Sequence, residues 1–253
     1  MPLIRADLHN HSCLSPCGSL DLSPAVLARR ARERGLDLVA LTDHNSARNA
    51  PAFRDRALRE GLAALYGVEA TCAEEAHVLA LFAAVEEALG FSEFLEAHLP
   101  RLPYDPRLLG DQAVVDADDN ILDLPELYLG AALDLGWDEV CLEADRRGAL
   151  VIPAHIDRPA FGALAQLGFL PEGPYAAVEA LRPQRGGEAR GYPVVSGSDA
   201  HYPEHVGRRP FTVDLPEGWR SEDGTVRLEA LRDALAAGRA RPYWETLPPS
   251  NGR

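Results

Sequence analysis

The chain has 253 residues, of which 46% are hydrophobic and 25% charged, a composition typical of a globular protein with one large domain or two smaller ones. Its formal net charge is −14, and all 25 of its basic residues are arginine. The absence of lysine excludes a lysine Schiff base and a P-loop, and the acidic balance argues against an extended nucleic-acid interface. No apolar segment reaches the roughly 20 residues of a membrane span and no signal-peptide pattern is present, so we expect a cytoplasmic protein without a membrane partner.

Apolar segments alternate with helical patterns along the chain, which predicts a parallel sheet covered by helices on both faces. The strands are expected at residues 3–8, 36–41, 63–68, 78–83, 149–152, 176–181, 194–195 and 211–215. The helices are expected at residues 24–34, 48–60, 85–102, 125–135, 137–147, 160–167 and 225–238. A hairpin is expected at residues 113–122, with its turn at Asp118-Asp119-Asn120. Because no repeat or linker is visible, we expect a single domain over residues 1–253, with a core at 3–240, a hairpin and helix elaboration around 100–135, and a tail at 241–253.

Histidines and carboxylates recur where the apolar strands end. His9 and His11 follow the first strand two residues apart, so an extended backbone directs both imidazoles to the same side. The strand ends carry, in chain order, His9, His11, His44, Glu69, His155, Asp199 and His201. His77 joins this set if residues 71–76 form a tight turn between two paired strands. Functional residues of barrel-like α/β folds gather at the C-terminal ends of strands, so the pattern predicts a metal site; mixed imidazole and carboxylate ligands suit zinc, manganese or iron better than calcium or magnesium.

The motifs, taken in order, resemble those of the polymerase-and-histidinol-phosphatase (PHP) family of metal-dependent phosphoesterases. They are Asp7-Leu8-His9-Asn10-His11-Ser12, Thr42-Asp43-His44, Glu69, His77, Pro153-Ala154-His155 and Ser198-Asp199-Ala200-His201. The resemblance covers residues 3–240 and implies a distorted seven-stranded (β/α) barrel with two or three divalent metal ions at the C-terminal ends of its strands.

The resemblance also implies an assignment of ligands. One ion would be held by His9, His11, Glu69 and Asp199; a second would share Glu69 and add His77 and His155; a third would take His44, His201 and a residue from the loop after His11. Many members have histidine or aspartate in that loop, whereas this chain has Ser15-Pro16-Cys17-Gly18. Cys17 is therefore either a thiolate ligand or a bystander. Asp7 and Asp43 adjoin ligands and are expected to orient imidazoles.

Closely spaced divalent ions suit phosphate-ester hydrolysis, because a water that bridges them becomes hydroxide near neutral pH and their charge neutralises phosphate oxygens. The expected catalytic centre is His9, His11, Glu69 and Asp199. Phosphate binding is expected from Arg158 and from Arg208 or Arg209, with surface salt bridges as the alternative. Three roles are open for His205: it supports a metal ligand from behind, it donates a proton to the leaving group, or it is a surface residue without a role in the site.

The leading hypothesis is hydrolysis of a small phosphorylated metabolite or nucleotide. A nuclease for short oligonucleotides is the second hypothesis, and it would need a basic groove built from Arg182, Arg185 and Arg190. A non-catalytic metal-binding module is the third. An amidohydrolase with a carbamylated lysine is excluded because the chain has no lysine. The sequence leaves the substrate, the metal and the oligomeric state open.

Overall fold

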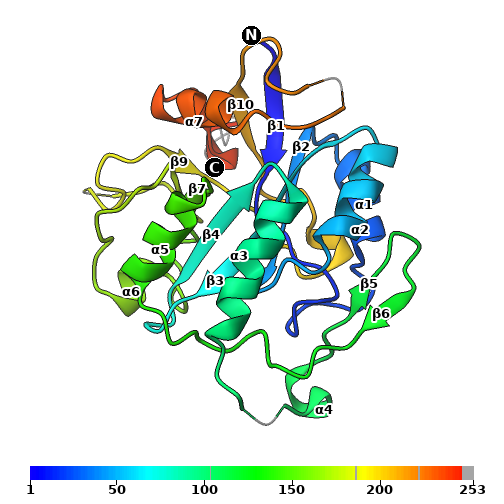
Figure 1. The fold of residues 1–253 in the computed structure, drawn as a ribbon. Helices are drawn as coiled ribbons and strands as arrows, with labels where there is room; N and C mark the ends of the chain where they lie inside the picture. The colour runs from blue at the N-terminus through cyan, green and yellow to red at the C-terminus, as the bar shows by residue number, and fades with distance from the viewer. Residues whose placement is uncertain (103, 186, 222, 247–253) are drawn as a thin grey trace, which may run out of the picture.

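A computed structural model describes residues 1–102, 104–185, 187–221 and 223–246. Its main element is a curled seven-stranded sheet of strand order β11-β10-β1-β2-β3-β4-β7 (Figure 1). The strands of this sheet are β1 (Leu3–Asp7), β2 (Leu38–His44), β3 (Ala63–Thr71), β4 (His77–Phe82), β7 (Leu150–Pro153), β10 (Phe211–Asp214) and β11 (Ala240–Arg241). Two small sheets pair β5 (Val114–Val115) with β6 (Ile121–Asp123), and β8 (Val178–Glu179) with β9 (Val194–Val195).

Helices cover the sheet and fill the connections. They are α1 (Pro24–Glu33), α2 (Ala50–Arg59), α3 (Val85–Ala97), α4 (Pro106–Leu109), α5 (Trp137–Arg146), α6 (Ala163–Gln166), the 3-10 helix η1 (Pro203–His205), α7 (Leu228–Ala236) and α8 (Tyr243–Thr246). Ser23 caps α1 by accepting a hydrogen bond from the backbone N–H of Val26, as its position before Pro24 predicts. None of the described helices is both long and apolar enough to cross a membrane.

The sheet is mixed, which corrects the expectation of a parallel sheet. Strands β1, β2 and β3 run parallel, but β4 is antiparallel to both β3 and β7, and β10 is antiparallel to β1. The reversal arises because residues 72–76 form a short turn that pairs Thr71 with His77, whereas parallel neighbours would need a long crossover. This hairpin confirms the condition that brings His77 back to the end of β3.

The small β8–β9 pair extends the curl of the main sheet. Parallel bridges join Val151 to Tyr175 and Asn10 to Ala200, so the chain after β9 lies beside the chain after β1. The result is the distorted α/β barrel expected from the sequence, in which the C-terminal ends of β1, β2, β3, β7 and β9 meet at one end.

The core has two layers because the central strands are buried on both faces. Leu38 and Leu65 face a layer that includes Leu231 and Leu235 of α7. The alternate positions of the same strands face the helices that precede and follow them; Val39, for example, belongs to the layer of α1 and α2. This two-sided burial explains the near-continuous apolar runs in the sequence.

Residues 125–135 are not helical, which corrects the predicted helix there. Two buried amide side chains donate hydrogen bonds to backbone carbonyls that, in a helix, would accept from the helix's own N–H groups. Gln112 donates to the carbonyls of Pro125 and Leu127, and Asn45 donates to those of Leu129 and Ala131. The predicted helix at 160–167 shrinks to α6, and the hairpin of the elaboration forms as β5 and β6. In the expected tail at 241–253, Arg241 belongs to β11, residues 243–246 form α8, and 247–253 lie outside the described residues.

Candidate metal centre

The C-terminal ends of the strands gather the histidines and carboxylates that the sequence singled out. His44 ends β2 directly opposite Glu69 of β3, and His77 begins β4 on the other side of Glu69. His155 follows β7, and Asp199 follows β9. Of the histidines and carboxylates that the sequence assigned to the strand ends, all are buried except His201, which is partly exposed.

One group consists of His9, His11, Glu69 and Asp199. The Nε2 atoms of His9 and His11 lie 3.2 Å from each other and each lies 3.2 Å from one oxygen of Glu69. Asp199 Oδ1 lies 3.5 Å from His9 Nε2 and 3.4 Å from His11 Nε2. Four potential ligand atoms from three parts of the chain therefore converge on one point.

Hydrogen bonds behind the two imidazoles fix which nitrogen faces that point. His9 Nδ1 lies 3.1 Å from both oxygens of Glu179, so it carries the proton and donates it. Ser15 Oγ donates to Asp43 at 2.7 Å and accepts from His11 Nδ1 at 2.9 Å. Both Nε2 atoms consequently face each other and the carboxylates. Burial alone would lower the pKa of His11, but the Asp199 and Glu69 carboxylates raise it to about 9, so the metal-free imidazole holds a proton that a bound cation would displace.

Two further groups adjoin the first. Glu69 Oε1 lies 2.7 Å from His77 Nδ1 and 3.0 Å from His155 Nε2, while Oε2 lies 3.2 Å from His44 Nδ1. His44 forms one group with Glu69 and His77, and another with His11 and His201. His44 thus lies between the positions expected for a second and a third ion, whereas the family resemblance associated it with the third alone.

Buried polar atoms without partners support the fit to cations. Among the described residues, Glu69 Oε2, Asp199 Oδ1 and His44 Nδ1 are buried and accept or donate no hydrogen bond. A buried ionisable atom left unpaired is costly, and divalent ions supply the missing interaction. The cluster of mixed nitrogen and oxygen donors fits zinc, manganese or iron.

The electrostatics keep Glu69, His44 and His201 in ligand-competent forms. Burial alone would raise the pKa of Glu69, but His77, His9 and His44 outweigh it and hold that pKa well below its ordinary value. Burial lowers the pKa of His44 well below its ordinary value and, together with His11, lowers the pKa of His201 to about 3. At neutral pH Glu69 is therefore anionic, while His44 and His201 are neutral and have a free lone pair.

Three of the seven non-glycine residues with positive φ in the described part of the chain lie at the same strand ends. Asn45, His155 and Asp199 adopt positive φ angles of 50°, 26° and 48°. Non-glycine residues rarely adopt this region, and such outliers often mark functional sites held by their surroundings. Asn45 is held by its side chain, which accepts a hydrogen bond from the backbone N–H of Thr71.

A cavity of about 360 Å³ opens onto the cluster. Its lining residues are Cys17, His44, His77, Arg158, Phe161, Asp199, His201, Tyr202, His205 and Arg208. The ring of Phe161 stacks on His77 at a centroid distance of 4.6 Å and forms one wall. The site is therefore reachable by a small ligand.

The predicted phosphate-binding arginines differ in their positions. Arg158 Nη1 donates to Asp199 Oδ2 at 2.9 Å and lies at the cavity, partly exposed. Arg208 also lines the cavity and donates to the backbone carbonyls of Ser198 and Asp199. Arg209 donates to the Ser198 carbonyl and is not among the lining residues. Arg158 and Arg208 are thus the two that can meet a ligand in this cavity.

Cys17 lines the cavity but does not belong to any of the three groups. Although its side chain is exposed, desolvation by the surrounding cavity wall and the nearby Glu69 raise the pKa of its thiol to about 12. A ligand role for Cys17 would therefore depend on a cation that stabilises the thiolate.

Two supporting residues were missed in the sequence. Glu179 ends β8, a short apolar strand, so the same rule that singled out Glu69 could have found it. Ser15 gave no signal, because its role depends on a fold that places it between His11 and Asp43. The predicted role of Asp43 in orienting an imidazole is exerted through Ser15. Asp7 instead accepts backbone N–H groups of Ser198 and Gly207 and so holds the loop after β9.

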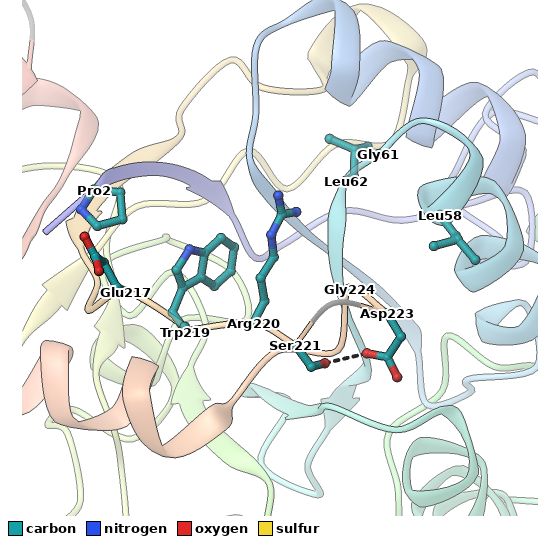
Figure 2. A pocket seen from close by; sticks show the side chains of 11 residues that line it. Pro2, Leu58, Gly61, Leu62, Glu217, Trp219, Arg220, Ser221, Asp223 and Gly224 are labelled. Carbon is teal, nitrogen blue, oxygen red and sulfur yellow. Dashed lines mark hydrogen bonds between the residues drawn. The ribbon is translucent and has the colours of Figure 1, made fainter.

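A larger hollow of about 580 Å³ lies at the opposite ends of the strands (Figure 2). Pro2 before β1 and Leu62 before β3 line it, together with Trp219 and Arg220. Its described lining residues include no histidine or cysteine and belong to none of the metal groups. The cavity at the C-terminal ends is therefore the candidate site.

The curled sheet and the buried histidine–carboxylate cluster define an α/β-barrel protein with a metal-binding centre. The family model of the PHP domain matches residues 7–142, and a model described as PHP-associated matches residues 185–240. Because the PHP domain model matches more than half of the chain, the protein belongs to the PHP family.

Three similar proteins illustrate the range of the family and fold. A PolC-type DNA polymerase III of Thermotoga petrophila is 37% identical over 70 residues, which are 27% of this chain and 5% of the polymerase. The lesion-specific endonuclease EndoQ of Pyrococcus furiosus aligns with a TM-score of 0.65 at 19% identity, over 95% of this chain and 58% of the endonuclease. An amidohydrolase of Chromobacterium violaceum with bound sulfate aligns with a TM-score of 0.53 at 20% identity, over 94% of this chain and 97% of that protein. The chain thus spans a small part of the polymerase and little more than half of the endonuclease.

Proposed function

We propose that the protein is a metal-dependent phosphoesterase that hydrolyses the phosphate ester of a small metabolite or nucleotide. The observation that carries this proposal is the convergence of His9 Nε2, His11 Nε2 and the Glu69 and Asp199 carboxylates, all acceptors, on one point. Divalent ions bound there would lower the pKa of water and neutralise charge on phosphate oxygens.

The proposed ligands follow the geometry. His9, His11, Glu69 and Asp199 hold the first ion. Further positions beside it are bounded by His44, His77, His155 and His201, with Cys17 as an additional candidate. Glu69 belongs to two of the three groups, and its two oxygens face different histidines, so it would be available to more than one ion.

The side chains around the ions have their own tasks. Glu179 and Ser15 hold His9 and His11 in the tautomer whose Nε2 lone pair faces the centre. Arg158 and Arg208 are positioned at the cavity to donate hydrogen bonds to the remaining phosphate oxygens. Phe161 covers one face of His77 and limits the access of water on that side.

The cavity volume of about 360 Å³ favours a small substrate over a long polymer. Two of the three arginines proposed for a nucleic-acid groove are also engaged: Arg182 pairs with Glu188 at 3.0 Å, and Arg190 pairs with Glu172. An ion pair at the surface leaves little net positive charge for a phosphate backbone.

A nuclease acting on short oligonucleotides is the second candidate function. It is favoured by the sequence similarity to a DNA polymerase III and by the endonuclease among the similar folds. The two functions make opposite predictions for the size of the substrate.

The test is a substrate panel on protein stripped by a chelator and reloaded with zinc, manganese or iron. We expect turnover of nucleoside monophosphates or sugar phosphates that depends on the metal and is restored by reloading. Degradation of labelled oligonucleotides with no hydrolysis of monophosphates would favour the nuclease, and no turnover of either by metal-loaded protein would refute the proposal.

A further inference from the structure

The loop after β9 carries one histidine that none of the metal groups uses. His205 ends η1 and lines the same cavity as Asp199 and His201. Within the described part of the chain, no group makes a hydrogen bond or an ion pair with its imidazole. The ring of Tyr202 packs edge-on against it, with a centroid distance of 5.3 Å and an angle of 76° between the planes.

The backbone around His205 is held firmly although its ring is uncommitted. The His205 N–H donates to the Tyr202 carbonyl at 2.9 Å, and the His205 carbonyl accepts from the Arg208 N–H at 3.1 Å. Arg34 donates to the Glu204 carbonyl and ties η1 to the end of α1. A fixed backbone with a free, partly exposed imidazole in a cavity wall is a suitable arrangement for a proton donor.

The other polar groups that line the cavity suit other tasks. His44, His77 and His201 belong to the metal groups, and Asp199 is a proposed ligand. The arginines of the wall stay charged because a guanidinium does not give up its proton in proteins. Histidine is the side chain whose ordinary titration range makes it an acid near neutral pH.

We infer that His205 donates a proton to the leaving oxygen in the phosphoesterase reaction proposed above, on which this inference rests. Water attacks phosphorus, forms the new P–O bond and releases one proton to solvent. The bond from phosphorus to the leaving oxygen breaks, and its electron pair goes to that oxygen. The imidazolium proton of His205 moves to the same oxygen, which departs as an alcohol, and the imidazole regains a proton from solvent at its exposed edge.

The experiment compares two esters with different leaving groups on metal-loaded protein. Glycerol phosphate must release an alkoxide that needs a proton, whereas 4-nitrophenyl phosphate releases a stable phenolate. We expect His205→Gln to lower kcat on glycerol phosphate by about 100-fold or more and on 4-nitrophenyl phosphate by less than about fivefold, because general acids contribute about 10²- to 10⁴-fold where the leaving group needs them. His98→Gln is the matched control and should change neither rate, because His98 pairs with Asp134 and belongs neither to the metal groups nor to the cavity lining.

Further measurements separate this role from others. The metal content and the thermal midpoint of His205→Gln should equal those of the wild type, and His205→Asn should repeat its kinetics. Tyr202→Phe should change both rates by the same small factor. Equal losses on the two esters, a selective loss in Tyr202→Phe, or a wild type that hydrolyses only the nitrophenyl ester would overturn the assignment of His205. A wild type that hydrolyses neither those esters nor any monophosphate of the panel would instead refute the proposed function.

Discussion

Replacing Glu179 by glutamine removes the carboxylate that holds His9 in its ligand tautomer. Both oxygens of Glu179 lie 3.1 Å from His9 Nδ1, and Oε1 also accepts from the His155 N–H at 3.2 Å. Glutamine keeps one oxygen but places an NH₂ group opposite the Nδ1–H, and it removes the negative charge that makes His9 a stronger ligand. Residues that orient a metal ligand in this way change metal affinity by about 10- to 100-fold, or about 1.4 to 2.7 kcal/mol. We expect Glu179→Gln to weaken binding of the first ion within that range.

The assay is a competition between metal-free protein and a chromophoric chelator, with zinc as the probe. Glu172→Gln is the matched control, because Glu172 is an exposed glutamate that pairs with Arg190 away from the centre. The control should bind zinc as the wild type does. A Glu179→Gln affinity within twofold of the wild type would refute the role given to Glu179.

Three further outcomes follow from the same geometry. A Cβ at Gly197 would lie 2.1 Å from Glu179 Oε2. Gly197→Ala should therefore lower both the Tm and the zinc content of the protein. An unchanged Tm in a melting scan would contradict this packing. Arg158→Ala should weaken inhibition by inorganic phosphate by about tenfold or more, because a hydrogen bond from a charged donor contributes about 1.5–3 kcal/mol. If phosphate inhibits the variant as strongly as the wild type, Arg158 does not bind phosphate. Burial alone would lower the pKa of His11, but the neighbouring carboxylates of Asp199 and Glu69 raise it to about 9. The protonated imidazole contributes its full stability below the unfolded pKa near 6.5, and this contribution is lost as the pH rises through 9. The Tm of the metal-free protein should therefore fall between pH 7 and 9.5, whereas the Tm of the zinc-loaded protein should not. Equal falls of the two Tm values would contradict this reasoning.

Local signals in the sequence were sufficient for most of the barrel strands and for the histidines and carboxylates that gather at their ends. The apolar runs that end at His44 and Glu69 are buried on both faces, and their ends pair directly across β2 and β3. The sequence placed His77 at this end only on the condition that the short polar segment before it forms a tight turn, and the pairing of β3 with β4 fulfils that condition. The ligand set itself came from the order of the motifs, because spacing alone cannot tell which histidines share an ion.

Long-range contacts account for what the sequence did not reveal. The helix predicted at 125–135 is displaced because Asn45 and Gln112, distant in the chain, bind its carbonyls. Glu179 meets His9 across 170 residues, so only the folded barrel shows that it fixes a tautomer. The sequence likewise could not show that Arg158 and Arg208 line the cavity while Arg209 does not, because several loops form that cavity.

The central claim is that His9, His11, Glu69 and Asp199 hold a metal ion required for phosphate-ester hydrolysis. Its most direct test measures metal content and turnover together on reloaded wild-type protein, His9→Ala and Asp199→Ala. We expect the wild type to bind two or three ions per chain and to hydrolyse a monophosphate, and each variant to lose at least one ion together with its activity. Variants that keep both the full metal content and the wild-type turnover would contradict the claim.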